Sequence, residues 1–212
     1  MSAIKERPIL FSAPMVRAIL EGRKTVTRRV VKVQPRSKAG IGSYGLGQPF
    51  IRNADVTKPN PECPYGRPGD RLWVREAWAA DAQLNAVPPH ELSRGEPILY
   101  PADGVTRTSG CSMISAGRVR PSIHMPRWVS RILLEITDVR VERLHDITGD
   151  QAEAEGVDAA MCQQFLESAP SRYECKEAVI HGFSGLWASI NGAEAWNANP
   201  WVWVVEFKRL TP

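Results

Sequence analysis

The sequence has few cysteines, and none of them is placed as a metal ligand would be. The four residues Cys63, Cys111, Cys162 and Cys175 are widely scattered, contain no CxxC pair and have no histidine at zinc-ligand spacing. Neither a structural metal nor a disulfide framework is therefore indicated. We expect reduced thiols in a cytoplasmic protein.

A long apolar run is also missing. No window approaches the roughly 18 apolar residues that are needed to span a bilayer, and Lys5, Glu6 and Arg7 precede only a very short apolar stretch. The sequence therefore predicts no export signal and no membrane partner. A strong charge of one sign is absent too: the net charge of +4 and the pI near 9.0 suit a polyanionic partner without requiring one.

What is present is an ordinary globular composition. Of the 212 residues, 43% are hydrophobic and 24% are charged, and this length favours one domain over residues 1–212. Two stretches, at about 34–68 and 81–120, are rich in turn-forming residues and lack sustained periodicity, so we interpret them as loop insertions. A loop as long as the first is either a functional flap or a mobile insertion.

The stretch from Ser12 to Arg29 predicts a short helix that leads into a strand. Ser12 can cap the helix through its side chain, apolar residues recur at helical spacing, and Gly22 can close the last turn. A dense set of donors and hydroxyls follows: Lys24, Thr25, Thr27, Arg28 and Arg29. Catalytic or ligand-binding residues are expected here before anywhere else in the chain, although a solvated basic strand edge has the same composition.

Lys24 and Thr27 are an odd number of residues apart, so on one regular strand they would face opposite sides of the sheet. One of them must then lie in the turn. If Lys24 is in the helix-to-strand connection, its flexible side chain can swing back toward Thr27, which makes a shared pocket possible.

Two further groups of residues are candidates for ligand binding. Arg75 and Glu76 interrupt an otherwise apolar strand predicted over 71–78, so they either find structural partners or point into a polar cavity. In VRPSIHMPRWVSR, Trp128 can stack on a planar base beside a cation, and the alternative is that Trp128 belongs to the core.

The C-terminal half predicts more regular elements. A strand from about residue 130 changes phase near Thr137. Asp146 or Thr148 caps a helix that Gly156 ends, and further helices are expected at 159–167 and 183–190. The run WVWVVEFKRL predicts a central strand that is paired on both sides.

These residues resemble the ASCH domains of the PUA-like superfamily. The resemblance rests on EGRKTVTRR, on the turn Pro68 to Asp70 before a strand, on LHDITGDQAEAEGV and on VVEFKRL, which are collinear over most of the chain. The blocks RPGDRLWVREAW, RPSIHMPRW and NPWVWVVEFKR look like ASCH proteins of phages and prophages. The resemblance implies an α+β fold, a PUA-like curled β-barrel with short flanking helices and long loop insertions.

The resemblance also implies a ligand, RNA or a modified nucleoside, and a chemistry. Some small bacterial ASCH proteins are amidohydrolases that deacetylate N4-acetylcytidine with a lysine, a threonine and a glutamate. Carried onto this sequence, these residues are Lys24, Thr27 and Glu155, and Glu153 is only two residues from the last of them. This chain is much longer than those enzymes, and its insertions can roof, narrow or replace the cleft.

The chemistry is sensible on physical grounds. Thr27 can supply a hydroxyl nucleophile, and Lys24 can act as its base if burial or a nearby cation such as Arg28 or Arg29 lowers the lysine pKa. Glu155 can orient the lysine or shuttle a proton, and Arg29 is a candidate for oxyanion or phosphate contacts. The reaction requires no metal and no cofactor.

Three functions are therefore expected in different classes. The first is an amidohydrolase for N4-acylated cytidine, and the second is a non-catalytic module that binds RNA or modified nucleic acid. The third, also implied by some ASCH relatives, is a metal-independent ribonuclease. Fold alone does not decide among them.

Overall fold

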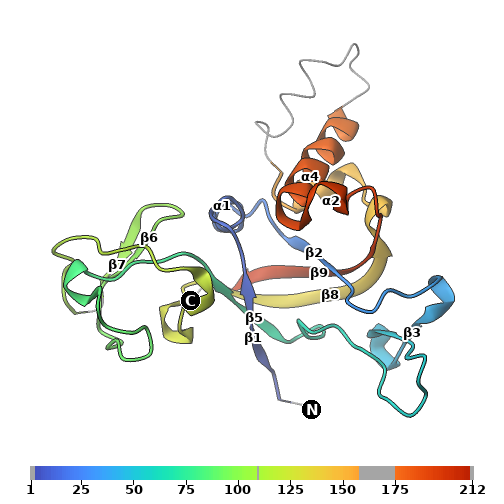
Figure 1. The fold of residues 1–212 in the computed structure, drawn as a ribbon, viewed down its shortest axis with the longest axis horizontal. Helices are drawn as coiled ribbons and strands as arrows, with labels where there is room; N and C mark the ends of the chain where they lie inside the picture. Colours follow the sequence, from blue (N-terminus) through green and yellow to red (C-terminus); the bar gives the residue numbers. More distant parts are fainter. Residues whose placement is uncertain (1–2, 109, 158–174, 211–212) are drawn as a thin grey trace. The chain divides into compact units, whose positions relative to one another are not determined.

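Strands outnumber α-helices among the described residues, and the predicted α+β class is confirmed (Figure 1). The computed structural model describes residues 3–108, 110–157 and 175–210. The chain divides into two units, which we describe separately. The first unit takes its residues from Met1–Glu21, Asp70–Glu135 and Arg209–Pro212, and the second from Gly22–Gly69 and Ile136–Lys208.

The first unit is built on three neighbouring strands. Its elements are β1 Glu6–Leu10, α1 Ala13–Leu20, β5 Arg71–Arg75, β6 Ile98–Tyr100, β7 Val105–Arg107 and the start of β8 Leu133–Arg143. Strand β5 pairs in parallel with β1 and antiparallel with β8, and β6 and β7 form a hairpin. A separate apolar cluster around Trp78 and Tyr100 forms a core for this unit.

Helix α1 lies where the sequence predicts it, but its cap differs. Val16 and Ile19 are buried at helical spacing, and Pro14 is in the first turn. Ser12 occupies the N-cap position and its backbone carbonyl accepts from the Val16 amide at 2.9 Å, yet its side chain makes no capping bond. The predicted side-chain cap is therefore wrong. The chain leaves the helix at Gly22, whose φ of +78° is in the left-handed region as predicted.

The second unit is a sheet with two helices on one face. Its elements are β2 Val26–Val30, β3 Ile41–Ser43, β4 Pro49–Ile51, the remainder of β8, α2 Gly149–Ala154, α4 Cys175–Asn191 and, as far as Lys208, β9 Trp201–Leu210. The strand order is β8-β9-β2, so β9 is central, as its sequence predicts. Val202 and Val204 of β9 pack with Ala152 of α2 and with Phe183 and Trp187 of α4.

Strand β8 shows the expected change of phase. Leu134 and Ile136 are buried and Thr137 is exposed. The next buried residue is Val139, which is three positions beyond Ile136 and therefore in the opposite phase. This shift lets one continuous strand present apolar side chains differently at its two ends. The described strands of neither unit close into a barrel.

The two predicted loop insertions contain small hairpins, β3–β4 in the first and β6–β7 in the second. Gly42 in β3 is required by packing, because a Cβ at this position would collide with the ring of Phe50. The strand predicted over 71–78 ends at Arg75. The helix predicted at 159–167 lies outside the described residues, and a single domain over 1–212 remains a prediction. None of the described helices is long and apolar enough to cross a membrane.

Candidate functional site

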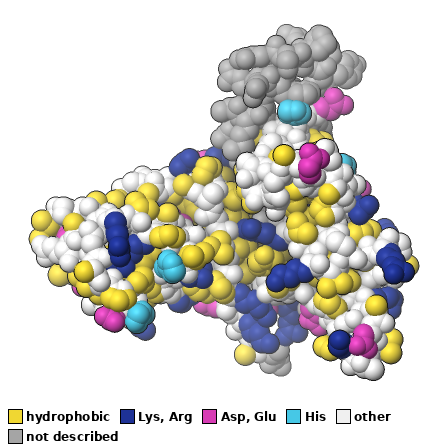
Figure 2. Space-filling model, in the orientation of Figure 1, with side chains coloured by type: hydrophobic (Ala, Val, Ile, Leu, Met, Phe, Trp, Pro, Cys, Tyr) yellow, Lys and Arg dark blue, Asp and Glu magenta, His cyan; other side chains and the backbone are white. Residues whose placement is uncertain are grey.

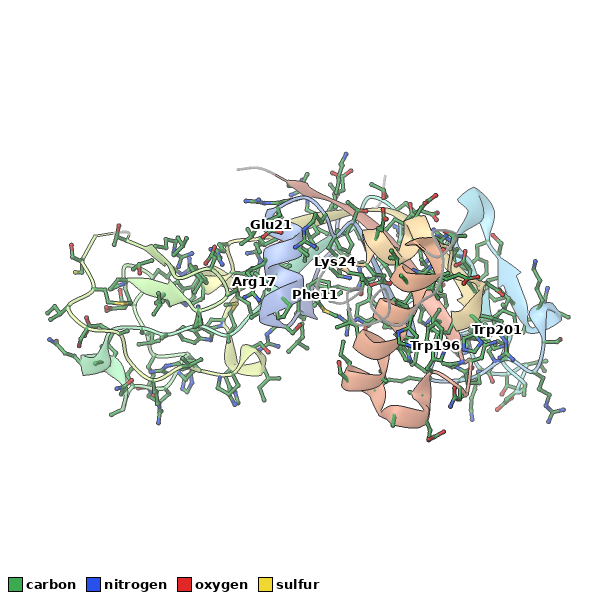
Figure 3. The ribbon with its side chains drawn as sticks, turned by 90° about the horizontal axis from the view of Figure 1, so that it is seen from above. Phe11, Arg17, Glu21, Lys24, Trp196 and Trp201 are labelled. Atoms are coloured by element: carbon green, nitrogen blue, oxygen red, sulfur yellow. The ribbon has the colours of Figure 1, made fainter. Side chains whose placement is uncertain are left out.

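Lys24 lies in the connection between α1 and β2, and its side chain is buried in the second unit (Figure 3). Its ammonium donates to the Glu155 carboxylate Oε2 at 2.7 Å, to the Glu155 backbone oxygen at 2.8 Å and to the Val26 backbone oxygen at 2.8 Å. Only 2% of Lys24 is exposed. The structure therefore brings together two of the three predicted catalytic residues, 131 positions apart in the chain.

The ammonium lies at the open edge of β2. The amide of Phe207 donates to the carbonyl of Thr25, and the amide of Val31 donates to that of Trp201, so the odd-numbered residues of β2 bond to β9. The carbonyl of Val26 therefore points away from β9, where Lys24 satisfies it. The amide of Thr25 donates to the carbonyl of Ala154 at 2.9 Å, which fixes the connection against the end of α2.

Glu155 is positioned by the two ends of α2. A capping box between Thr148 and Gln151 starts the helix, Glu155 is its C-cap, and Gly156 follows with a φ of +90°. Of the two glutamates considered from the sequence, Glu153 is exposed and Glu155 is 3% exposed. Glu155 is therefore the residue that meets Lys24.

Arg28 completes the cluster from β2, two residues beyond Val26 on the same face of the strand. Its Nη1 donates to Glu155 Oε1 at 3.3 Å, and its Nη2 donates to Gln151 Oε1 at 2.7 Å and lies 3.5 Å from Glu142 Oε2. The two oxygens of Glu155 are thus divided between Lys24 and Arg28. Sequence reasoning named Arg28 only as a nearby charge and did not name Gln151, although Gln151 and Glu155 are four residues apart on one helix face.

Burial lowers the pKa of Lys24 below its ordinary value, because the charged form loses its hydration. The Glu155 carboxylate opposes this shift, while the positive charges of Arg29 and Arg28 add to it. The direction is the one that a lysine base requires. From the sequence, Lys24 was expected to act as a base only if burial or a nearby arginine lowers its pKa.

Thr27 lies inside β2 and is also buried. Because side chains alternate along a strand, Thr27 and Arg29 face the side of the sheet opposite to Val26 and Arg28. Val26 and Arg28 face α2, as their contacts with Ala152, Gln151 and Glu155 show. Thr27 therefore faces away from α2. Lys24 instead reaches the free edge of β2, where its ammonium contacts the Val26 carbonyl and Glu155.

The other predicted ligand-binding residues belong to the first unit. Glu76 is 1% exposed and forms a bidentate ion pair with Arg131, at 2.9 and 3.0 Å. Arg131 also bonds twice to Asp103, and its guanidinium lies 4.0 Å from the centre of the Tyr100 ring. Burial raises the pKa of Glu76, and Arg131 opposes this. Of the two alternatives for Glu76, a structural partner or a polar cavity, the structure shows the partner, which is Arg131.

Arg75 and Trp128 are also engaged within the first unit. Arg75 donates to the carbonyl of Ile123, and its guanidinium lies 5.4 Å from the centre of the Trp73 ring. Trp128 is partly buried against the apolar cluster of this unit, with the guanidinium of Arg107 at 5.7 Å from its ring. Trp128 therefore packs on the core of this unit, and its stacking on a base stays a prediction.

The second-unit cluster can move a proton between two of its own groups, because the lysine nitrogen and the Glu155 carboxylate are in direct contact. Among the described residues, no group of three His, Cys, Asp or Glu side chains is arranged to hold a metal ion. No protein-family model, no curated protein and no solved structure matches the chain.

Proposed function

We propose that the protein is a metal-independent amidohydrolase that acts on N4-acetylcytidine-like substrates, as a free nucleoside or within RNA. The observation that carries the proposal is the buried contact of 2.7 Å between Lys24 Nζ and Glu155 Oε2. A buried lysine whose pKa is lowered and which touches a carboxylate has the properties of a general base. The resemblance of EGRKTVTRR to the ASCH domains supports the same assignment.

The proposed reaction begins with a proton transfer inside the pair. As an ammonium, Lys24 donates its three hydrogens to the Glu155 carboxylate and to two backbone oxygens, so it has no lone pair to offer. Transfer of one proton to Glu155 leaves a neutral amine beside a carboxylic acid. The amine then takes the proton of the Thr27 hydroxyl as its oxygen attacks the acyl carbon.

The remaining steps return every proton. The amide C–N bond breaks, the leaving N4 amine takes the proton of Glu155, and the acetyl group stays on Thr27 as an ester. Water then attacks the ester and gives a proton to Glu155, while the Thr27 oxygen takes one from Lys24. The Glu155 proton finally passes back to the Lys24 amine, which restores the ion pair. The products are cytidine and acetic acid. Arg29 shares a strand face with Thr27 and is the candidate donor to the oxyanion.

The proposal includes the PUA-like barrel. The strand order β8-β9-β2, with a helix-to-strand connection that delivers Lys24 to the sheet edge, supports it. The structure establishes the α+β class, and closure of the sheet into a barrel is part of the proposal.

Incubation with N4-acetylcytidine, followed by chromatography for cytidine, tests the proposal. We expect turnover without added metal in the wild-type protein, and none above background in the Lys24→Ala and Thr27→Val proteins. Thr27→Val keeps the shape of the side chain and removes only the hydroxyl. Turnover that is equal in all three proteins, or absent at high enzyme concentration, would exclude this hydrolase.

An RNA-binding module without catalysis is the second candidate. Lysine and arginine outnumber aspartate and glutamate, 27 to 23, and basic side chains are prominent on the face drawn in Figure 2. This function predicts salt-dependent RNA binding that weakens in Arg29→Ala or Trp128→Ala. Cleavage of the RNA without metal, lost in Lys24→Ala, would identify the ribonuclease instead.

A further inference from the structure

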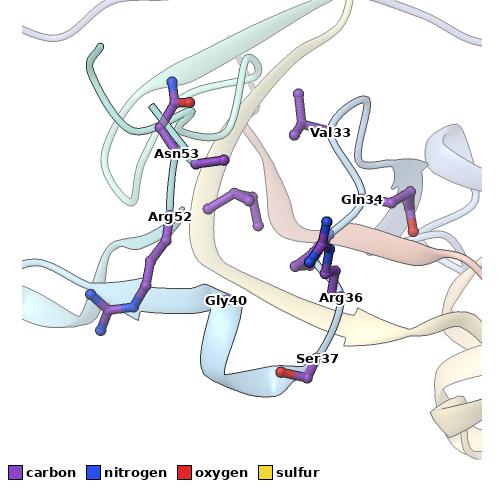
Figure 4. Close-up of a pocket in the computed structure, with 10 residues that line it drawn as sticks. Val33, Gln34, Arg36, Ser37, Gly40, Arg52 and Asn53 are labelled. Carbon is purple, nitrogen blue, oxygen red and sulfur yellow. The ribbon is translucent and has the colours of Figure 1, made fainter. Parts of the chain in front are cut away.

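A pocket of about 380 Å³ lies in the second unit, between the chain that follows β2 and the chain that follows β4 (Figure 4). It is lined by Val33, Gln34, Pro35, Arg36, Ser37, Gly40, Ile51, Arg52, Asn53 and Ala54. Its volume is within the range of small-ligand sites, about 300–1,000 Å³. None of the residues that line it belongs to the cluster of Lys24, Arg28, Gln151 and Glu155. The pocket is therefore separate from the Lys24 cluster.

Both walls of the pocket are fixed by hydrogen bonds. On one wall, Gln34 donates to the carbonyls of Val31 and Trp201 at 2.6 and 3.0 Å, and accepts from the Trp201 amide at 2.7 Å. On the other, the Arg52 amide donates to the carbonyl of Gly40 at 2.8 Å. These bonds hold the pocket open before any ligand arrives, which lowers the entropy cost of binding.

The lining of the pocket combines an apolar surface with a basic rim. Val33, Pro35, Ile51 and Ala54 supply the apolar part, and Figure 4 shows Arg36 between the two walls. The chain from 32 to 52 carries four cations, Lys32, Arg36, Lys38 and Arg52, and no acidic residue. All four are exposed, and two of them, Arg36 and Arg52, line the pocket itself.

The nearest acidic residue in the chain does not neutralise this charge. Asp55 accepts from the hydroxyl of Thr57 at 2.6 Å and lies 3.3 Å from the ammonium of Lys58. The Asp55 carboxylate is therefore engaged by residues of its own turn, Thr57 and Lys58. An apolar surface next to several cations fits a flat, weakly polar ring that carries an anion. A guanidinium such as that of Arg36 binds a phosphate through two parallel hydrogen bonds.

We propose that this pocket is a nucleotide-binding site, with the base against the apolar wall and the phosphate on Arg36. The nucleotide is either a free nucleoside monophosphate or one residue of a nucleic-acid strand, and both present the same ring and phosphate. The site is independent of the hydrolase, because it uses neither Lys24 nor Glu155.

A titration of the ¹⁵N-labelled protein with cytidine monophosphate tests the site by amide chemical shifts. We expect the largest shifts at Ser37, Arg52 and Asn53, and weaker binding of cytidine without its phosphate. Arg36→Glu should weaken binding at least about tenfold, since it removes a charge-assisted bidentate contact. Arg94→Glu, which makes the same charge change at an exposed residue of the first unit, should stay within about twofold of wild type.

A second arm of the experiment distinguishes the two sources of nucleotide. Hexacytidylate binding through the same amides and at least about tenfold more tightly than the monophosphate would assign the site to a strand, because a strand also engages the neighbouring cations. Equal affinities would assign it to a free nucleotide. The proposal is overturned if millimolar cytidine monophosphate leaves the pocket amides unshifted, or if the Arg36→Glu protein binds it as tightly as wild type. Neither result depends on turnover of N4-acetylcytidine.

Discussion

Each unit holds a buried charge cluster among its described residues, and the two clusters are built from different cations. In the first unit, Arg131 holds Glu76 and Asp103. In the second, Lys24 and Arg28 divide the two oxygens of Glu155. Each cluster has one carboxylate that is nearly inaccessible to water, so each must offset a similar loss of hydration.

The choice of cation decides what each cluster can do. Arginine does not release its proton in proteins, and its carboxylate partners raise the pKa of Arg131 still further. Burial lowers the pKa of Lys24 instead. Arg131 can therefore only fix the conformation around its carboxylate partners, whereas Lys24 can also release a proton, as the proposed function requires.

The largest expected difference between the clusters is in turnover. Glu155→Gln should reduce kcat for N4-acetylcytidine by about 10²–10⁴, because a neutral amide can neither take the proton of Lys24 nor return it. Glu76→Gln, the same change in the first cluster, should leave kcat of the folded protein within about threefold of wild type. Steady-state kinetics with a circular dichroism check on folding makes the comparison. Equal losses would show that both substitutions act through the fold.

The next difference is in stability. Arg131→Met leaves Glu76 and Asp103 side by side with no cation between them, and should lower the free energy of unfolding by about 3–5 kcal/mol. Lys24→Met leaves Glu155 with Arg28, so we expect a smaller loss of about 2 kcal/mol. Urea unfolding measures both. A greater loss in Lys24→Met would mean that Arg28 does not support the carboxylate.

The sequence predicted the elements of both clusters better than it predicted their contacts. Helix α1, the hairpin in the first insertion, the phase change in β8 and the central strand β9 follow from local patterns, because capping, turn chemistry and periodicity act over a few residues. A β-strand pairing or a salt bridge depends on register between distant segments. The partner of Glu76 was therefore left open, and Arg131 was not identified.

The candidate site shows the same division. Lys24 was singled out from its place after the predicted helix, Glu155 came from the family resemblance, and the contact between them is present. The face of Thr27 follows from strand alternation once the start of β2 is known, and that boundary is only two residues beyond Lys24. The bond from Arg28 to Gln151 could not be predicted, because it joins a strand to a helix 123 residues away.

The pH dependence of stability should have opposite signs in the two clusters. Folding raises the pKa of Glu76 above 4.5, so the folded state binds this proton more tightly and the contribution of Glu76 to stability increases as the pH falls through that raised pKa toward 4.5. Folding lowers the pKa of Lys24 below 10.5, so the unfolded state holds this proton more tightly and stability increases as the pH rises through the lowered pKa toward 10.5.

Urea unfolding from pH 4 to pH 10 measures these contributions against variants that do not titrate. Relative to Glu76→Gln, the wild-type protein should gain stability at the acidic end. Relative to Lys24→Met, it should gain at the alkaline end. Curves that stay parallel to those of the two variants would mean that neither group has a shifted pKa in the folded protein.

The smallest expected difference lies between the starts of two helices, α1 in the first unit and α2 in the second. Thr148 accepts from the Gln151 amide at 3.3 Å, whereas the Ser12 side chain makes no capping bond. Thr148→Ala should therefore lower the free energy of unfolding by about 1 kcal/mol, and Ser12→Ala by less than about 0.5 kcal/mol. Thermal unfolding measures both, and Thr148→Ser, which keeps the hydroxyl, should restore most of the loss. Gln151 bonds to Arg28 as well, so loss of this cap loosens the residue that orients Arg28 toward Glu155. A Thr148→Ala protein with unchanged stability would show that the hold on Glu155 comes from Lys24 and Arg28 and not from the start of α2.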